Sequence, residues 1–148
     1  MRQQFVIFEL AGQDYAIDIA LVNEITEIKE ITKMPKVETY IEGILNLRGN
    51  VIPVVNLKKI LNITSENPGN KQILVSSTDE NLAGLMIDSA KDVKNVDEDE
   101  IEPVSSVLQS GKNSYKGVIN VDGNLVLILD VENIVNFNTV REELDEAV

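Results

Sequence analysis

Residues 43–50 read Gly-Ile-Leu-Asn-Leu-Arg-Gly-Asn, and residues 117–124 read Gly-Val-Ile-Asn-Val-Asp-Gly-Asn, an ungapped match at an offset of 74 residues (43 to 117). The match continues from residues 51–57 to residues 125–131, where apolar residues persist in both copies. Each copy places a short glycine-containing turn between apolar runs, a pattern typical of a β-hairpin. The repeat therefore predicts two similar half-domains, each containing one such hairpin.

Other segments extend the all-β prediction to most of the chain. Strand-like runs lie at Phe5–Leu10, Tyr15–Ile17, 72–77 and 82–87, and Ile17-Asp18 is echoed by Ile87-Asp88 at an offset of 70 residues (17 to 87). Small repeated hairpins bury one face each and tend to close into barrels, which hides most strand edges. We therefore expect two barrel-like halves packed side by side, with a boundary in the polar loop near residues 64–70.

Little helix is expected. Apolar residues at helical spacing predict a short helix within residues 19–25, and residues 131–144 predict a C-terminal helical segment. The folded domain is expected to span residues 1–138, followed by an acidic tail at residues 139–148.

Composition narrows the function. The 148 residues include no Cys and no His, which argues against thiol chemistry, Cys or His zinc sites, and the commonest general base. A net charge of −12 opposes binding to nucleic acid or anionic membranes. No stretch is long enough to span a bilayer and the N-terminus lacks a leader pattern, so a cytoplasmic protein with protein partners and no cofactor is predicted.

The two hairpin turns differ in one informative position. The second turn, Asp122-Gly123, suits positive φ at both residues, whereas the first is Arg48-Gly49. Arg gains nothing over Asp in turn geometry, so either the turn type differs or the guanidinium has a task at the tip. A solvated cation and a group that grips a partner's carboxylate are both open interpretations.

Two further positions carry structural hypotheses. Asn46 recurs as Asn120, which predicts a side-chain amide that satisfies backbone groups beside each hairpin. Pro53 is replaced by Leu127 in the second copy, and a proline within a strand predicts an edge strand.

Residues 40–57 carry a family resemblance. They read Tyr-Ile-Glu-Gly-Ile-Leu-Asn-Leu-Arg-Gly-Asn-Val-Ile-Pro-Val-Val-Asn-Leu, with Tyr15-Ala16-Ile17-Asp18-Ile19 and Val22-Asn23-Glu24-Ile25 upstream. These runs resemble the CheW family of chemotaxis coupling proteins, and the likeness extends from Phe5 to about Asn136. The resemblance implies two packed five-stranded SH3-like β-barrel subdomains. It also implies a groove for the tip of a chemoreceptor and a separate surface for the regulatory domain of the histidine kinase CheA.

Carried over by position, the resemblance implies a receptor-facing set made of Val22, Glu24, Gly43, Arg48, Gly49, Ile73 and Gly84. Each has a structural alternative. Val22 and Ile73 could be core residues, Glu24 a solvated charge, and Gly43 or Gly84 a place where the sheet turns or another strand approaches closely. The residues that would contact the kinase are not predicted.

Rival functions have weaker support. Asp18, Asp88 and Asp130 could pair as acid and base, but their spacing also suits turns and caps. Residues 111–114 lack the upstream glycine of a phosphate loop, and the acidic run 97–100 lacks the glycine of a calcium loop. A scaffold outside chemotaxis and a free-standing relative of the kinase regulatory domain remain the alternatives. The length leaves no room for a fused receiver domain.

Overall fold

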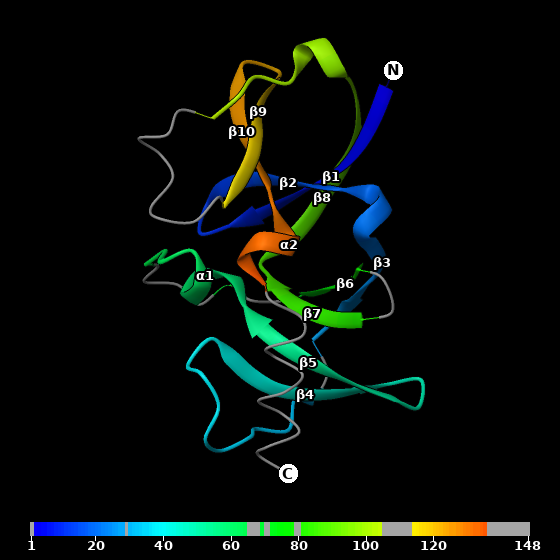
Figure 1. Ribbon diagram of the computed structural model, residues 1–148, viewed down its shortest axis with the longest axis vertical. Coiled ribbons are helices and arrows are strands. Elements are labelled where there is room, and N and C mark those ends of the chain that lie inside the picture. Colours follow the sequence, from blue (N-terminus) through cyan, green and yellow to red (C-terminus); the bar gives the residue numbers. More distant parts are fainter. Residues whose placement is uncertain are drawn as a thin grey trace.

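The computed structural model describes residues 2–28, 30–64, 69, 72–78, 81–104 and 114–135. They form two five-stranded sheets with a few short helical turns, which confirms the mostly β prediction (Figure 1). Sheet A has the strand order β8-β1-β2-β10-β9, from β8 (Ser89–Asp97), β1 (Arg2–Leu10), β2 (Gln13–Asp18), β10 (Asn124–Leu129) and β9 (Tyr115–Val121). Sheet B has the order β3-β6-β7-β5-β4, from β3 (Val22–Glu27), β6 (Gln72–Thr78), β7 (Asn81–Ile87), β5 (Asn50–Asn56) and β4 (Ile41–Leu47).

The two repeats exchange strands. Sheet A joins the first hairpin of the first repeat, β1 and β2, to the last three strands of the second repeat, and sheet B does the reverse. Four pairings join the repeats: the parallel pairs β2–β10 and β5–β7, and the antiparallel pairs β1–β8 and β3–β6. The expected boundary near residues 64–70 therefore does not separate the sheets, because β1 and β2 lie with the second repeat.

Three buried clusters hold the fold together. One cluster lies in sheet A, with Phe5, Ile7 and Ile128, and a second lies in sheet B, with Val54, Ile73 and Val75. The third takes the alternate residues of the same strands, and it fills the space between the sheets. Its members come from both sheets, from α1 (Leu57–Ile60) and from α2 (Val131–Ile134), and they include Val6, Phe8, Leu10, Ile17, Val55, Leu57, Leu74, Leu85, Ile87, Leu129 and Val131. Strands buried on both faces explain the nearly continuous aliphatic runs in the sequence.

The helix predicted within residues 19–25 does not form. In place of a helix over residues 19–25, η1 (Ile19–Leu21) forms one 3₁₀ turn and β3 begins at Val22. Pairing of β3 with β6 supplies backbone partners that override the local spacing. At the C-terminal end α2 covers residues 131–134 with Val135 as its C-cap, and residues 136–148, which hold the rest of the predicted segment and the acidic tail, lie outside the described residues. No helix among the described residues is long and apolar enough to cross a membrane.

Pro53 does not mark an edge strand, so that prediction is wrong. The strand β5 lies inside sheet B, between β7 and β4. Pro53 faces Ile44 of β4, one residue from the pair formed by Leu45 and Ile52. Pairing with β7 begins only at Val54, so no neighbouring strand requires a donor from residue 53.

Burial of Tyr15 predicts a loss of stability at alkaline pH. Burial first, and then the neighbouring Tyr115, raise the pKa of Tyr15 from 10.0 to about 12. The fold favours the neutral phenol, so this contribution to stability is complete below about pH 10 and is lost between about pH 10 and about pH 12. We expect the denaturant midpoint of Tyr15→Phe to fall less than that of the parent across this range. An equal fall in both proteins would contradict the assignment.

Candidate protein-interaction site

The two hairpin tips have the same backbone geometry. Arg48 and Gly49 have φ of 52° and 85°, and Asp122 and Gly123 have φ of 52° and 88°. Positive φ at both central residues is the geometry of a type I′ turn, which suits Asp and Gly but costs energy for Arg. Since the turn type is the same, the sequence difference at residue 48 requires another reason than turn geometry.

Both turns are braced by an asparagine, as the repeat predicts. The side-chain oxygen of Asn46 accepts a hydrogen bond from the backbone N–H of Gly49 at 3.1 Å. Asn120 accepts from the N–H of Gly123 at 2.9 Å. The structural role predicted for this pair is confirmed, and the turns are held rigidly at the ends of their hairpins.

Each tip forms an ion pair with a strand of the same sheet, but the charges are inverted between the repeats. In sheet B, Nη1 of Arg48 lies 2.9 Å from Oε2 of Glu24 on β3. In sheet A, Nζ of Lys94 on β8 lies 4.0 Å from Oδ2 of Asp122. Residues 24 and 94 are related by the offset of 70, and residues 48 and 122 by the offset of 74. The hairpin tip of sheet B therefore carries a positive residue, and the hairpin tip of sheet A carries a negative one.

The Arg48 tip is accessible. The side chain of Arg48 is 77% exposed, whereas that of Glu24 is only 19% exposed. The carboxylate of Glu24 therefore pairs with the guanidinium from the protein side, and most of the Arg48 side chain faces solvent. An exposed ion pair adds at most about 1 kcal/mol to stability, which leaves Arg48 available for recognition.

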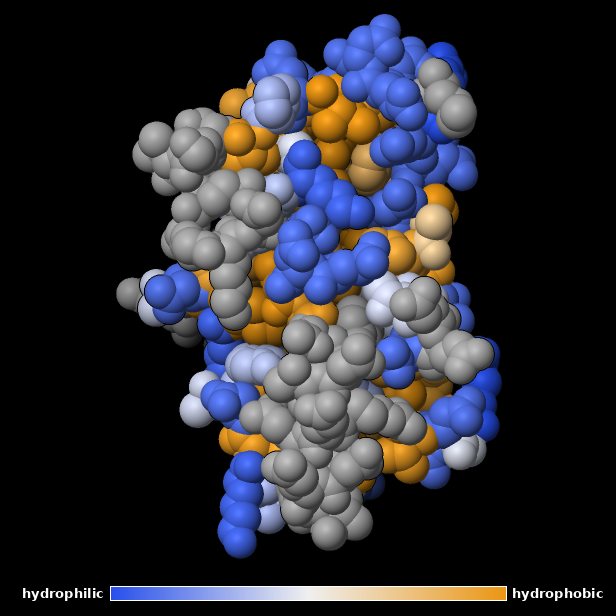
Figure 2. Space-filling view, viewed as in Figure 1, coloured by the Kyte–Doolittle hydropathy of each residue, from blue (hydrophilic) through white to orange (hydrophobic). Residues whose placement is uncertain are grey.

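An aliphatic side chain accompanies each tip. Val51 and Leu125, which are equivalent in the repeat, are 53% and 64% exposed. On the face shown in Figure 2, hydrophilic residues cover much of the upper half, where sheet A lies in Figure 1, and hydrophobic residues show between them. Arg is enriched at protein interfaces and Asp is depleted there, so the Arg48 tip is the better candidate for a protein contact.

All seven candidate residues lie on sheet B or its hairpin turn. Val22 and Glu24 are on β3, Gly43 is on β4, Ile73 is on β6 and Gly84 is on β7. The structure thus brings the set to one sheet, although only Arg48 and Gly49 are fully exposed.

The buried members of the set have structural roles. A side chain at Gly84 would place its Cβ 2.9 Å from Cγ2 of Ile73, which is itself 0% exposed. A Cβ at Gly43 would lie 2.1 Å from the carbonyl oxygen of Thr32, because the backbone at Thr32 crosses β4 there. Val22 is half-buried and packs against the cluster between the sheets. These residues serve the packing of sheet B and present no polar side chain of their own.

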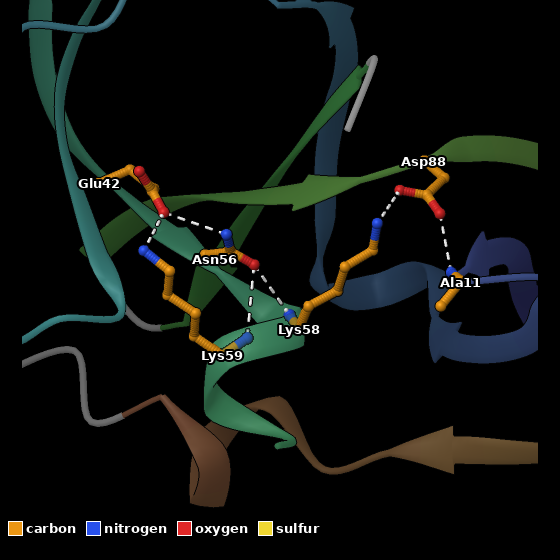
Figure 3. A network of polar contacts seen from close by, with 6 residues as sticks. All are labelled: Ala11, Glu42, Asn56, Lys58, Lys59 and Asp88. Atoms are coloured by element: carbon orange, nitrogen blue, oxygen red, sulfur yellow. Dashed lines mark hydrogen bonds and ion pairs between the residues drawn. The ribbon is translucent and has the colours of Figure 1, made fainter. Parts of the chain in front are cut away.

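A second polar cluster lies where β5 meets α1 (Leu57–Ile60) (Figure 3). The amide of Asn56 donates to Oε1 of Glu42 at 3.0 Å, and its oxygen accepts from the backbone N–H of Lys58 at 3.0 Å. Lys59 completes the cluster with Nζ 2.9 Å from Oε1 of Glu42. Burial alone would raise the pKa of Glu42, but the hydrogen bonds from Asn56 and Lys59 and the nearby lysine charges outweigh it and lower the pKa.

Each of the three aspartates of the enzymatic alternative has a structural partner. Asp18 accepts from the N–H of Ala20 at the start of η1, and Asp130 accepts from the N–H of Asn133 in α2. Asp88 pairs with Lys58, with Nζ 2.7 Å from Oδ1. The sequence did not reveal this pair, because nothing in the local pattern links residues 30 positions apart (58 to 88).

Known proteins resemble the chain over nearly its whole length. A model of the CheW-like domain matches residues 4–138. The chemotaxis protein CheW of Thermotoga maritima is 36% identical over 135 residues, which cover 91% of this chain and 89% of the relative. The CheW protein of Bacillus subtilis is 31% identical, with 90% and 87% covered.

A solved structure agrees with these matches. The scaffolding protein TtCheW of Thermoanaerobacter tengcongensis superimposes with a TM-score of 0.80 at 33% identity, covering 88% of this chain and 86% of that one. The sequence matches, the shared fold and the Asn-Leu-Arg-Gly hairpin lead to one conclusion: the chain belongs to the family of proteins with a CheW-like domain.

Proposed function

We propose that this chain is an adaptor that couples chemoreceptors to the histidine kinase CheA. The observation that carries the proposal is the exposed Arg48 at a rigid hairpin tip, held by Glu24 on the sheet that contains every receptor-facing candidate. Family membership makes the chain a non-catalytic scaffold. We expect it to work in the cytoplasm, where the kinase and the receptor tips would be accessible.

The receptor should dock on sheet B, beside the Arg48 tip. A guanidinium there can bind a carboxylate bidentately, and the half-buried Glu24 keeps it oriented toward solvent. Val51 supplies apolar contact area on the same hairpin. A receptor segment that combines an acidic residue with apolar side chains fits this surface.

The kinase should use another surface. The two repeats are not equivalent, because the tip of sheet A carries Asp122 and Lys94 where sheet B carries Arg48 and Glu24. Inverted charge favours different partners at the two tips and disfavours binding of one partner twice. An adaptor requires this kind of asymmetry.

Coupling would arise from binding alone. A scaffold that binds the active and inactive arrangements of a kinase and receptor assembly with different affinities shifts the equilibrium between them. Rigid sheets lower the entropic cost of each contact, so modest interfaces suffice.

A competition titration tests the proposal. We expect the chain, once saturated with the CheA regulatory domain, to bind a receptor tip fragment without releasing the kinase domain. Fluorescence anisotropy of each partner, labelled with a different dye, would follow both signals. Stoichiometric displacement of the kinase domain by the receptor would contradict bridging.

The same experiment separates the alternatives. A scaffold outside chemotaxis would bind neither partner at micromolar concentrations. A free-standing relative of the kinase regulatory domain would bind receptor and another adaptor of its family, but it would not bind the CheA regulatory domain through a distinct surface.

A further inference from the structure

A buried ion pair joins the two sheets at one place. Lys58 is on α1, directly after β5 of sheet B, and Asp88 lies between β7 and β8, where the chain passes from sheet B to sheet A. Nζ of Lys58 is 2.7 Å from Oδ1 of Asp88, and the two side chains are only 8% and 11% exposed. The pair is therefore largely shielded from solvent and from salt.

Asp88 also holds the first hairpin of sheet A (Figure 3). Its Oδ2 accepts a hydrogen bond from the backbone N–H of Ala11 at 2.7 Å, and its own N–H donates to the carbonyl oxygen of Glu9 at 3.0 Å. Gly69 packs so closely that an added Cβ would lie 2.9 Å from the carboxyl group. Asp88 thus links α1, which follows the last residue of β5 in sheet B, to the β1–β2 turn of sheet A.

The equivalent place in the other repeat has no such pair. The repeat offsets relate Lys58 to Glu132 and Asp88 to Asp18, so both positions are acidic. Asp18 instead accepts from the N–H of Ala20 at 2.9 Å. An open surface depression of about 330 Å³ lies beside it, lined by Ala20, Leu21, Ser77, Thr78 and Glu132. One junction between the sheets is therefore fixed by an ion pair, whereas the equivalent described positions carry two acidic residues that cannot pair with each other.

The energetics of a buried pair indicate its role. Desolvation of two charges largely cancels their attraction, so an apolar pair of similar volume gives equal or greater stability. A charged pair with fixed partners nevertheless has one favourable geometry, whereas apolar side chains between two sheets can repack with little loss of stability. We propose that the Lys58–Asp88 pair is an orientation lock, which selects one angle between sheets A and B rather than adding to stability.

Paired spin labels on the isolated chain test the lock. The chain has no Cys, so labels can be attached at Val51→Cys on sheet B and Val93→Cys on sheet A, both at exposed positions. In the labelled Lys58→Met/Asp88→Asn double variant, which removes both charges but keeps a side-chain oxygen to accept from the N–H of Ala11, we expect the distance distribution to broaden or shift while the denaturant midpoint changes little. In the parent the distribution should be narrow.

A matched control removes an ion pair that does not join the sheets. Glu42→Gln with Lys59→Met breaks the contact between β4 and α1, and the distance distribution should stay narrow. An unchanged distribution in the Lys58/Asp88 variant would overturn the proposal, because the apolar cluster alone would then fix the angle. A strong fall in its midpoint, or failure to fold, would also overturn it by showing that the pair supplies stability. No partner is needed, so the result is independent of the proposed adaptor role.

Discussion

Arg48→Glu should weaken binding to a receptor tip by about tenfold or more, which corresponds to about 1.4 kcal/mol, while the fold stays intact. The guanidinium is exposed and pairs with Glu24, so its loss should cost at most about 1 kcal/mol of stability. Reversal leaves two carboxylates side by side on the docking surface and repels an acidic partner. Calorimetric titration with a receptor tip fragment would measure the affinity, and thermal melting would report the fold.

Asp122→Lys is the matched control. It breaks the equivalent contact with Lys94 at an identical turn, again by charge reversal at an exposed tip. Receptor affinity should change less than twofold. Equal loss in both variants would show a general electrostatic effect, and a large fall in the melting temperature of Arg48→Glu would show that Arg48 is a structural residue.

The hairpins were predictable because their determinants are local. The turn residues at 48–49 and 122–123 and the flanking apolar runs specify each hairpin within about a dozen residues. The exchange of strands between the repeats was not predictable in this way. It depends on the parallel pairing of β2 with β10, which joins residues 112 positions apart (15 to 127), and a repeat shows likeness without showing which copies pair.

The strand β8 was missed for a different reason. Residues 89–97 contain Lys91, Asp92 and Lys94, and only Val93 and Val96 are large apolar residues. The strand is an edge of sheet A and only Val96 of it is buried, so it lacks the apolar signal on which strand prediction depends.

The candidate site was predicted unevenly. The comparison of Arg48 with Asp122 drew attention to the tip from the sequence alone, but only the family resemblance suggested Glu24. The ion pair between Arg48 and Glu24 requires β3 and the β4–β5 turn to come together in sheet B. The spacing of residues in the sequence does not predict that contact. The ion pair between Lys58 and Asp88 was not predicted, because buried ion pairs have no local sequence pattern.

Gly43→Ala should destabilise the protein by about 3 kcal/mol or more. Gly43 has φ of +151°, which side chains rarely adopt, and a Cβ would lie 2.1 Å from the carbonyl oxygen of Thr32. That oxygen accepts a hydrogen bond from the N–H of Ile44 at 2.8 Å, and the N–H of Thr32 donates to the oxygen of Ile44 at 2.9 Å. Making room for the methyl group would separate the segment at Thr32 from β4 and break both bonds. Urea denaturation would give the change in unfolding free energy.

Gly49→Ala separates backbone strain from the clash. Gly49 also has positive φ, at +85°, but nothing lies within 4 Å of the added Cβ, so the cost should be only about 1–2 kcal/mol. The difference between the two variants measures the close approach of the backbone at Thr32 to β4. If Gly43→Ala were as stable as Gly49→Ala and yet lost receptor binding, Gly43 would contact the receptor directly. A large difference in stability instead means that Gly43 serves the docking surface by letting the backbone at Thr32 lie against β4.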